Sequence, residues 1–162
     1  MVEKMPSTVK DQLREQLEAA RGEYYQALES VTDEQWLLSS GNPKSTIGGE
    51  FAHIALGLGT VPLRMESART GKAKSRMPQF VFDFANTRLT SKSARQHDRR
   101  SVRPYFDEQY NNAIRLLDGV EDQEWNLISH TYIQRWTVQE IFANQASHIR
   151  EHLGNVKAGL GR

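Results

Sequence analysis

The stretch that decides the fold is LESVTDEQW at residues 28–36, because the chain repeats it as LDGVEDQEW at residues 117–125. A second pair follows, with TIGGEFAH at residues 46–53 matched by TVQEIFAN at residues 137–144. The period is about 90 residues, and each unit has the pattern of a helix, an acidic turn with a tryptophan, and a second helix. Neither αα-hairpin can bury its apolar face alone, so the repeat predicts an all-α four-helix bundle.

Apolar residues that recur every three or four positions predict the four helices of this bundle. The helices are expected from Ser7 or Thr8 to about Ser30, from Ser45 or Thr46 to about Arg69, from a point between Thr90 and Ser101 to about Gly119, and from Thr137 to about Gly159. Residues 70–89 are expected to be irregular. This long connection between helices 2 and 3 frees the bundle from strict up-down-up-down order.

Several single residues shape the expected hairpins. Trp36 and Trp125 are interpreted as large rings that close each hairpin. Pro62 predicts a kink in the second helix. That helix also contains glycines, which a helix tolerates where a neighbouring helix or a ligand comes close. These are Gly48, Gly49, Gly57 and Gly59. A loop is expected through Ser129 and His130.

Composition indicates one globular domain over residues 1–162, since 38% hydrophobic and 25% charged residues are ordinary for a folded protein. The chain has no apolar run near the roughly 20 residues that a membrane span needs. The N-terminus lacks the apolar core of a signal peptide. Without cysteine, any metal must be held by His, Asp or Glu. We therefore expect a cytoplasmic protein without a membrane partner.

Positive charge is concentrated in one segment, although the formal net charge is only +1. Residues 64–103 hold 11 Lys or Arg against three acidic residues. Within this segment Arg88, Arg95 and Arg99 are candidates to attract an anionic small-molecule substrate, and the alternative is a solvated basic face. Nucleic-acid binding is not expected, because the net charge is near zero and no recognition motif is present.

Two histidines mark the last predicted helix. His148 and His152 are four residues apart, so their imidazoles stack one turn apart on one helical face. Two such nitrogens can hold one side of a transition metal, and His53 from the second helix would make a third ligand. Three protein ligands leave a position for water or substrate.

The alternative is that these histidines are ordinary polar residues of a helix surface. His148 and His152 lie at the edge of their helix's apolar stripe, where they would be half-buried. His53 is placed worse, roughly 120° from the middle of its own stripe at 100° per residue. His97 and His130 are expected on the surface or in loops.

The motifs resemble those of the DinB/YfiT-like superfamily, whose members are regarded as metalloenzymes. TIGGEFAH at residues 46–53 is similar to that family's Thr-Val-x-x-Leu/Ile-Leu-x-His, and HIREHLGN at residues 148–155 to its His-x-x-x-His-Arg-Gly-Gln. The resemblance covers nearly the whole chain. It implies a four-helix bundle with an open site for nickel, zinc or a similar divalent ion, held by His53, His148 and His152. Leu153 and Asn155 depart from the family's Arg and Gln, so contacts around the site are expected to differ.

The sequence leaves two classes of function open, an enzyme and a non-catalytic binding protein. The resemblance implies a metal-dependent transferase or isomerase that uses a low-molecular-weight thiol, an implication to which the segment from Asp83 to Arg88 adds a short similarity. The alternative is a non-catalytic metal- or ligand-binding stress-response protein, since the evident candidates for a general base are only Glu50, Glu140 and Glu151.

The apolar run at residues 80–84 has two interpretations. Phe80, Val81, Phe82 and Phe84 could form a hydrophobic lid or a subunit contact. Dimers are the commonest oligomers, so we expect a homodimer.

Overall fold

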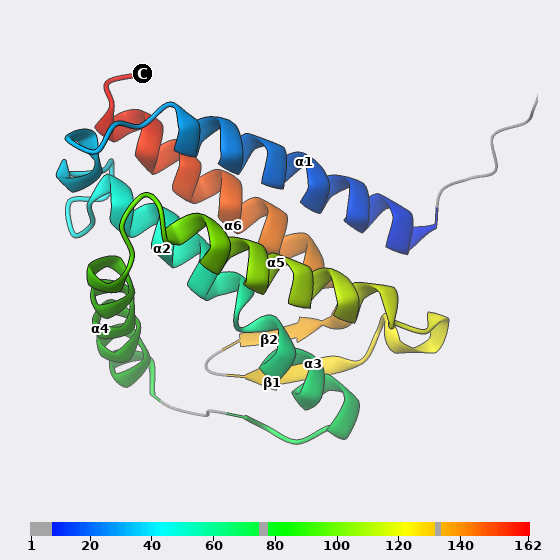
Figure 1. Cartoon of the computed structure of the whole chain (residues 1–162). Helices are drawn as coiled ribbons and strands as arrows, with labels where there is room; N and C mark the ends of the chain where they lie inside the picture. Colours follow the sequence, from blue (N-terminus) through cyan, green and yellow to red (C-terminus); the bar gives the residue numbers. More distant parts are fainter. Residues whose placement is uncertain (1–7, 75–77, 132–133) are drawn as a thin grey trace, which may run out of the picture.

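The structure is a computed structural model that describes residues 8–74, 78–131 and 134–162 (Figure 1). Its helices are α1 (Val9–Glu29), α2 (Ile47–Leu58), α3 (Val61–Thr70), α4 (Gln79–Gln96), α5 (Val102–Asp118) and α6 (Val138–Gly159). Short 3-10 helices span Gln35–Leu37 and Asp122–Glu124, and the strands are β1 (Ile128–Thr131) and β2 (Gln134–Thr137). None of the helices within the described ranges is long and apolar enough to cross a membrane.

Four of these helices form the predicted bundle. In the ring of contacts α1 packs against α6, α6 against α2, α2 against α5, and α5 against α1 (Figure 1). The core between them holds large side chains with almost no exposure, including Tyr24, Phe51, Phe106 and Phe142. The rings of Tyr24 and Phe106 stack with centroids 3.8 Å apart, which joins α1 to α5. The all-α prediction is therefore confirmed.

The helix starts follow from capping side chains. Thr8 and Asp11 form a reciprocal capping box at the start of α1, and Thr137 and Glu140 form another at the start of α6. Thr46 caps α2 through a bond from the Gly49 amide to its hydroxyl. Each cap satisfies backbone amides that have no partner within the helix. Of the two alternatives at the first helix, Ser7 lies outside the described residues.

The tryptophans of the repeat differ in their surroundings. Trp36 is buried and stacks on Phe51 with ring centroids 5.5 Å apart. A Cβ on Gly48 would lie 2.3 Å from the Trp36 ring, so this position of α2 needs a glycine for the ring to fit. Trp125 is only partly buried against the core. The interpretation of a ring that closes the hairpin suits Trp36 better than Trp125.

The prediction of one kinked second helix is wrong, because this part of the chain forms two helices, α2 and α3. Gly59 ends α2 and Thr60 precedes α3. Pro62 stands in the first turn of α3, where its missing N–H leaves no hydrogen bond unmade. The proline therefore marks a new helix start, not a bend within a continuous helix.

The expectation of an irregular segment at residues 70–89 is wrong from Gln79 onward, whereas residues 71–73 belong to no helix or strand. Helix α4 begins at Gln79, after Pro78, and packs against α2 outside the bundle (Figure 1). Phe80, Val81 and Phe84 are exposed, while the side chain of Phe82 lies outside the described residues. The apolar run did not predict a helix, because it is too short for periodicity to distinguish a helix from a strand, and its three described side chains are exposed.

A β-hairpin stands where a loop was expected. Strand β1 pairs antiparallel with β2, with Ile128 opposite Thr137, and β1 packs against α3. The side chains of Ser129 and Thr131, both in β1, are buried. Strands of four residues are too short to be recognised from the alternation of apolar and polar residues. Packing of β1 against α3 stabilises the hairpin.

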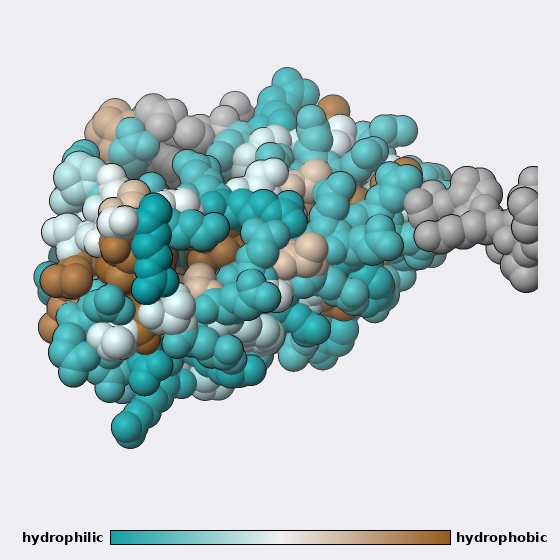
Figure 2. Space-filling view, turned by 90° about the horizontal axis from the view of Figure 1, so that it is seen from above, coloured by the Kyte–Doolittle hydropathy of each residue, from teal (hydrophilic) through white to brown (hydrophobic). Residues whose placement is uncertain are grey.

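The surface seen from above is mostly hydrophilic (Figure 2). Hydrophobic residues gather toward the end that carries the connection between α1 and α2 (Figure 2). Leu37 and Leu38 of this connection are both exposed.

Candidate metal centre

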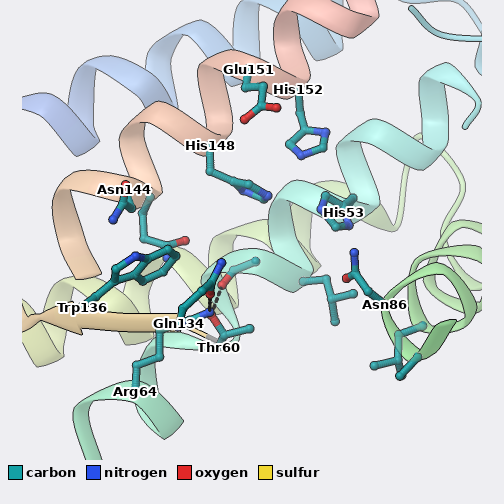
Figure 3. Close-up of a pocket in the computed structure, with 15 residues that line it drawn as sticks. His53, Thr60, Arg64, Asn86, Gln134, Trp136, Asn144, His148, Glu151 and His152 are labelled. Carbon is teal, nitrogen blue, oxygen red and sulfur yellow. Dashed lines mark hydrogen bonds between the residues drawn. The ribbon is translucent and has the colours of Figure 1, made fainter. Parts of the chain in front are cut away.

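The three candidate histidines lie together between α2 and α6. One ring nitrogen from each of His53, His148 and His152 lies within 4.8 Å of the corresponding nitrogens of the other two. The ring centroids are 5.1 Å apart for His53 and His148, and 4.4 Å apart for the other two pairs. Figure 3 shows the rings converging from the two helices.

His53 reaches this cluster although the helical wheel placed it poorly. The helical-wheel argument holds for a helix that buries one apolar stripe. Helix α2 instead contacts α4, α5 and α6 and is buried on nearly every side. Helix α4, which was not expected, covers the side of α2 that seemed open to solvent. The half-buried position of His53 is therefore set by a neighbour that periodicity did not predict.

Hydrogen bonds fix the orientation of each of two rings, those of His53 and His152. His53 Nδ1 lies 2.9 Å from Thr90 Oγ1 on α4. His152 Nδ1 is bonded to Glu50 Oε2 on α2. Since an ionised carboxylate only accepts, Nδ1 of His152 carries the proton of this hydrogen bond. With Nδ1 engaged in both residues, Nε2 is the nitrogen left to bind a metal.

Glu50 is the centre of a buried hydrogen-bond network. Besides the His152 ring, Ser40 Oγ donates to its Oε1 at 2.7 Å and Asn155 Nδ2 to its Oε2 at 3.2 Å. Burial acts to raise the pKa of the Glu50 carboxyl, but these three hydrogen bonds outweigh it and lower the pKa to about 2. Asn155, one of the departures from the family motif, thus contributes a contact to this network.

A glycine makes room for the third ring. A Cβ at Gly57 of α2 would lie 2.6 Å from Cε1 and 2.9 Å from Nδ1 of His148. Any larger residue at Gly57 would push the imidazole of His148 out of its place. The repeat aligns Gly57 with His148, so the position where one half lacks a side chain receives the histidine of the other half.

Burial favours the neutral form of two of the imidazoles, those of His53 and His148. Desolvation, aided by the neighbouring His152, lowers the pKa of His53 to about 4. Desolvation lowers the pKa of His148 to about 3, with smaller contributions from His152, His53 and Arg64. Neutral imidazole is the form that binds a metal.

The cluster fits a divalent cation by its donors and nearly by its spacing. Imidazole nitrogens on one tetrahedral ion at 2.0–2.1 Å would be about 3.3 Å apart. The separations of up to 4.8 Å therefore need only small side-chain rotations to close.

The cluster opens into a cavity of about 410 Å³, a volume suited to a small molecule. Leu56, Leu89 and Trp136 give it apolar walls. A second, more polar cavity of about 190 Å³ lies on the other side of His53 and His152, and Asn86 lines both.

The three candidate general bases have different surroundings. Glu50 is held by its hydrogen bonds, and Glu140 is used in the capping box of α6. Glu151 alone of the three lines the large cavity. His97 stacks on Tyr105 and His130 lies in β1, so neither belongs to the cluster.

The basic candidates lie elsewhere than expected. Within the described part of the chain, Arg88, Arg95 and Arg99 line neither cavity, and Arg99 pairs with Asp33 at 2.7 Å. Arg64, at the start of the same basic segment, is buried on the wall of the large cavity.

Sequence reasoning missed several other residues of the cavity. Gln134 and Trp136 come from the hairpin that was expected to be a loop. Gln145 could have been found, because it lies three residues before His148 and so shares its helical face.

The fold and the site define the class as a four-helix bundle with a three-histidine cluster between two of its helices. A profile of the DinB superfamily matches residues 16–156. The chain belongs to the DinB superfamily, and the resemblance found in the sequence is confirmed. No curated protein matches the sequence.

Solved structures share this fold at low sequence identity. YfiT from Bacillus subtilis, described as a probable metal-dependent hydrolase with an unusual four-helix bundle topology, is 17% identical. It has a TM-score of 0.72 and the match covers 99% of this chain and 93% of that one. The colibactin self-resistance protein ClbS, solved with double-stranded DNA, is 15% identical with a TM-score of 0.71, and 98% of each chain is covered.

The mycothiol-dependent maleylpyruvate isomerase is a larger relative in structure. Its H52A mutant is 16% identical, with a TM-score of 0.71, and the match covers 93% of this chain but 63% of that one. At these identities the likeness concerns the fold.

Proposed function

We propose that the protein is a metal-dependent enzyme in which His53, His148 and His152 hold one divalent cation. The observation that carries the proposal is the convergence of three half-buried imidazoles, two of them with Nδ1 held by Thr90 and Glu50. Histidines with a purely structural role would not need to bring one ring nitrogen each so close together.

Nickel and zinc are the proposed cations, because neutral imidazole suits both. A bound cation supplies Lewis acidity, which polarises a substrate oxygen or sulfur and lowers the pKa of a coordinated group. The chain's own residues hold and shield the site. Glu50 and Thr90 orient the rings, while Leu56 and Trp136 exclude water from one side of the cavity.

Glu151 is proposed to move protons. Its side chain lines the cavity one residue before His152, within the group of residues that would surround a bound substrate (Figure 3). A carboxylate there can accept a proton from a thiol or a water molecule.

The reaction is proposed to be a transfer or isomerisation that uses a low-molecular-weight thiol. Support comes from the cavity, whose volume suits a small molecule, and from the fold shared with a mycothiol-dependent isomerase. Hydrolysis is the second candidate, favoured by the description of YfiT.

A panel of thiols and electrophilic acceptors, together with ester and amide substrates, tests this function on the metal-loaded protein. We expect turnover that is lost in His148→Ala and reduced in Glu151→Gln. Metal bound at the site without turnover across the panel would instead favour the non-catalytic metal- or ligand-binding protein.

A further inference from the structure

One wall of the large cavity carries a buried cation. Arg64 is only 5% exposed and, within the described part of the chain, is the one Lys or Arg that lines the cavity. Figure 3 shows its side chain rising from α3 toward Gln134 and Thr60, on the side of the cavity away from the histidines. Its positive charge is close enough to contribute to the lowered pKa of His148.

The guanidinium is fixed in one orientation. Arg64 Nε donates to Thr60 Oγ1 at 3.2 Å, Nη1 to Thr131 Oγ1 at 2.8 Å and Nη2 to Gln134 Oε1 at 2.6 Å. The guanidinium carbon lies 4.2 Å from the ring centroid of Trp136. These three hydrogen-bond acceptors are neutral groups, and they fix the position of the guanidinium. A planar, pre-oriented guanidinium matches the geometry of a carboxylate.

A second polar group of the cavity points to a ligand. Gln145 is 4% exposed and its Oε1 has no hydrogen-bond partner within the described residues. A buried acceptor without a partner is costly, and a ligand with an N–H or O–H would satisfy it. Gln145 lines the same cavity as Arg64.

We propose that Arg64 recognises a carboxylate of the substrate, and that the substrate is a small bifunctional molecule whose other end reaches the three histidines. This inference rests on the proposed function, because the second end needs the metal. Arg64 takes the place of Arg88, Arg95 and Arg99 as the proposed source of selectivity for anions. Among these four arginines, Arg64 alone combines burial, a fixed orientation and a place on the cavity wall.

Two thiols of equal chain length test the inference on cobalt-loaded, untagged protein. The probes are 3-mercaptopropionate, which carries a carboxylate, and 3-mercapto-1-propanol, which does not. Binding is followed by the change in the visible spectrum of the cobalt protein. We expect the carboxylate probe to bind at least about tenfold more tightly to the wild type, as for a charge-assisted hydrogen bond.

The variants Arg64→Met and Arg64→Gln are expected to lose this preference while binding the alcohol as the wild type does. Circular dichroism and cobalt content show which of the two keeps the fold and the metal. Arg64→Lys restores part of the preference, because it returns the charge without the planar fork. Arg100→Met is the matched control, since it removes an exposed charge from the same basic segment and leaves the preference intact.

The outcomes separate the two proposals. A wild type that binds no stoichiometric cobalt overturns the metal site and this inference with it. If cobalt binds but the wild type does not prefer the carboxylate probe, only the role of Arg64 is overturned. The same conclusion follows if the neutral Arg64 variants keep the preference, or if Arg100→Met loses it. Should neither neutral variant fold, the wild-type preference and its change in Arg64→Lys decide the question.

Discussion

At the scale of single residues, the site depends on one missing side chain. Gly57 is the position where α2 passes the ring of His148, and a methyl group there would overlap that ring. Helix propensity favours alanine over glycine, by about 1 kcal/mol. The glycine thus weakens α2 slightly, and it leaves the space that His148 occupies.

Gly57→Ala is expected to impair metal binding without unfolding the protein. The new Cβ displaces the His148 imidazole, while the helix gains in propensity. The measurement is metal affinity by competition with a chromophoric chelator, alongside the free energy of unfolding.

Gly22→Ala is the matched control for this substitution. Gly22 lies within α1 with nothing near its Cβ position, so the change is expected to stabilise by up to about 1 kcal/mol and to leave metal affinity unchanged. Wild-type metal affinity in Gly57→Ala would show that the His148 ring does not need this space.

Glu50→Gln is expected to weaken metal binding by about 10–100-fold, as is typical when a partner of a metal-binding histidine is changed. The amide removes the negative charge that holds the Nδ1 proton of His152. The same competition assay measures the effect. Glu140→Gln, which alters a carboxylate at the far end of α6, is the control. Equal affinities for the two variants would mean that Glu50 does not position His152.

At the scale of elements, α6 shows which features sequence reasoning can predict. Its start at Val138 and its end at Gly159 follow from Thr137, which is visible as a cap, and from the apolar period of its core face. The meeting of His148 and His152 follows from their spacing in the same helix. These are local properties, and a local pattern was enough to find them.

Helix α4 and the hairpin show the opposite case. Phe80 and Phe84 are exposed, so α4 presents no clear apolar stripe to the bundle. Strand β1 packs against α3, and β2 is placed by its pairing with β1 and its contact with α6. Arg64, Gln134 and Trp136 come together only through these tertiary contacts, and for that reason the wall of the cavity could not be predicted.

Thr137→Ala is expected to lower the free energy of unfolding by about 1 kcal/mol, because α6 loses its N-cap. Urea denaturation followed by circular dichroism measures the change. Metal content should stay at the wild-type level, since His148 lies three turns farther along the helix. An unchanged unfolding midpoint would indicate that the capping box contributes nothing to the stability of α6.

At the scale of the whole molecule, two surfaces bear on partners. Much of the basic segment is engaged within the chain: Arg69 bonds Glu124, Lys74 bonds Glu66, and Arg103 lies 3.8 Å from Glu29. These ion pairs reduce the charge that the segment presents to a polyanion. The other surface is α4, where Phe80, Phe84 and Leu89 are 74%, 64% and 54% exposed.

We propose that this face of α4 forms the contact of a homodimer, because burial of large apolar side chains favours association. Light scattering should give twice the 18.5 kDa of the chain. Phe84→Ser should shift the mass toward that of one chain. Leu37→Ser, at an exposed leucine of the connection between α1 and α2, should not. A wild type with the mass of a single chain would contradict the proposal.

The most direct test of the metal centre is elemental analysis of the untagged protein by inductively coupled plasma mass spectrometry. A single three-histidine site predicts about one divalent ion per chain. This ion should be lost in His53→Ala, His148→Ala and His152→Ala, and retained in His97→Ala, whose ring lies outside the cluster. Protein without stoichiometric metal, or metal content unchanged in the three cluster variants, would contradict it.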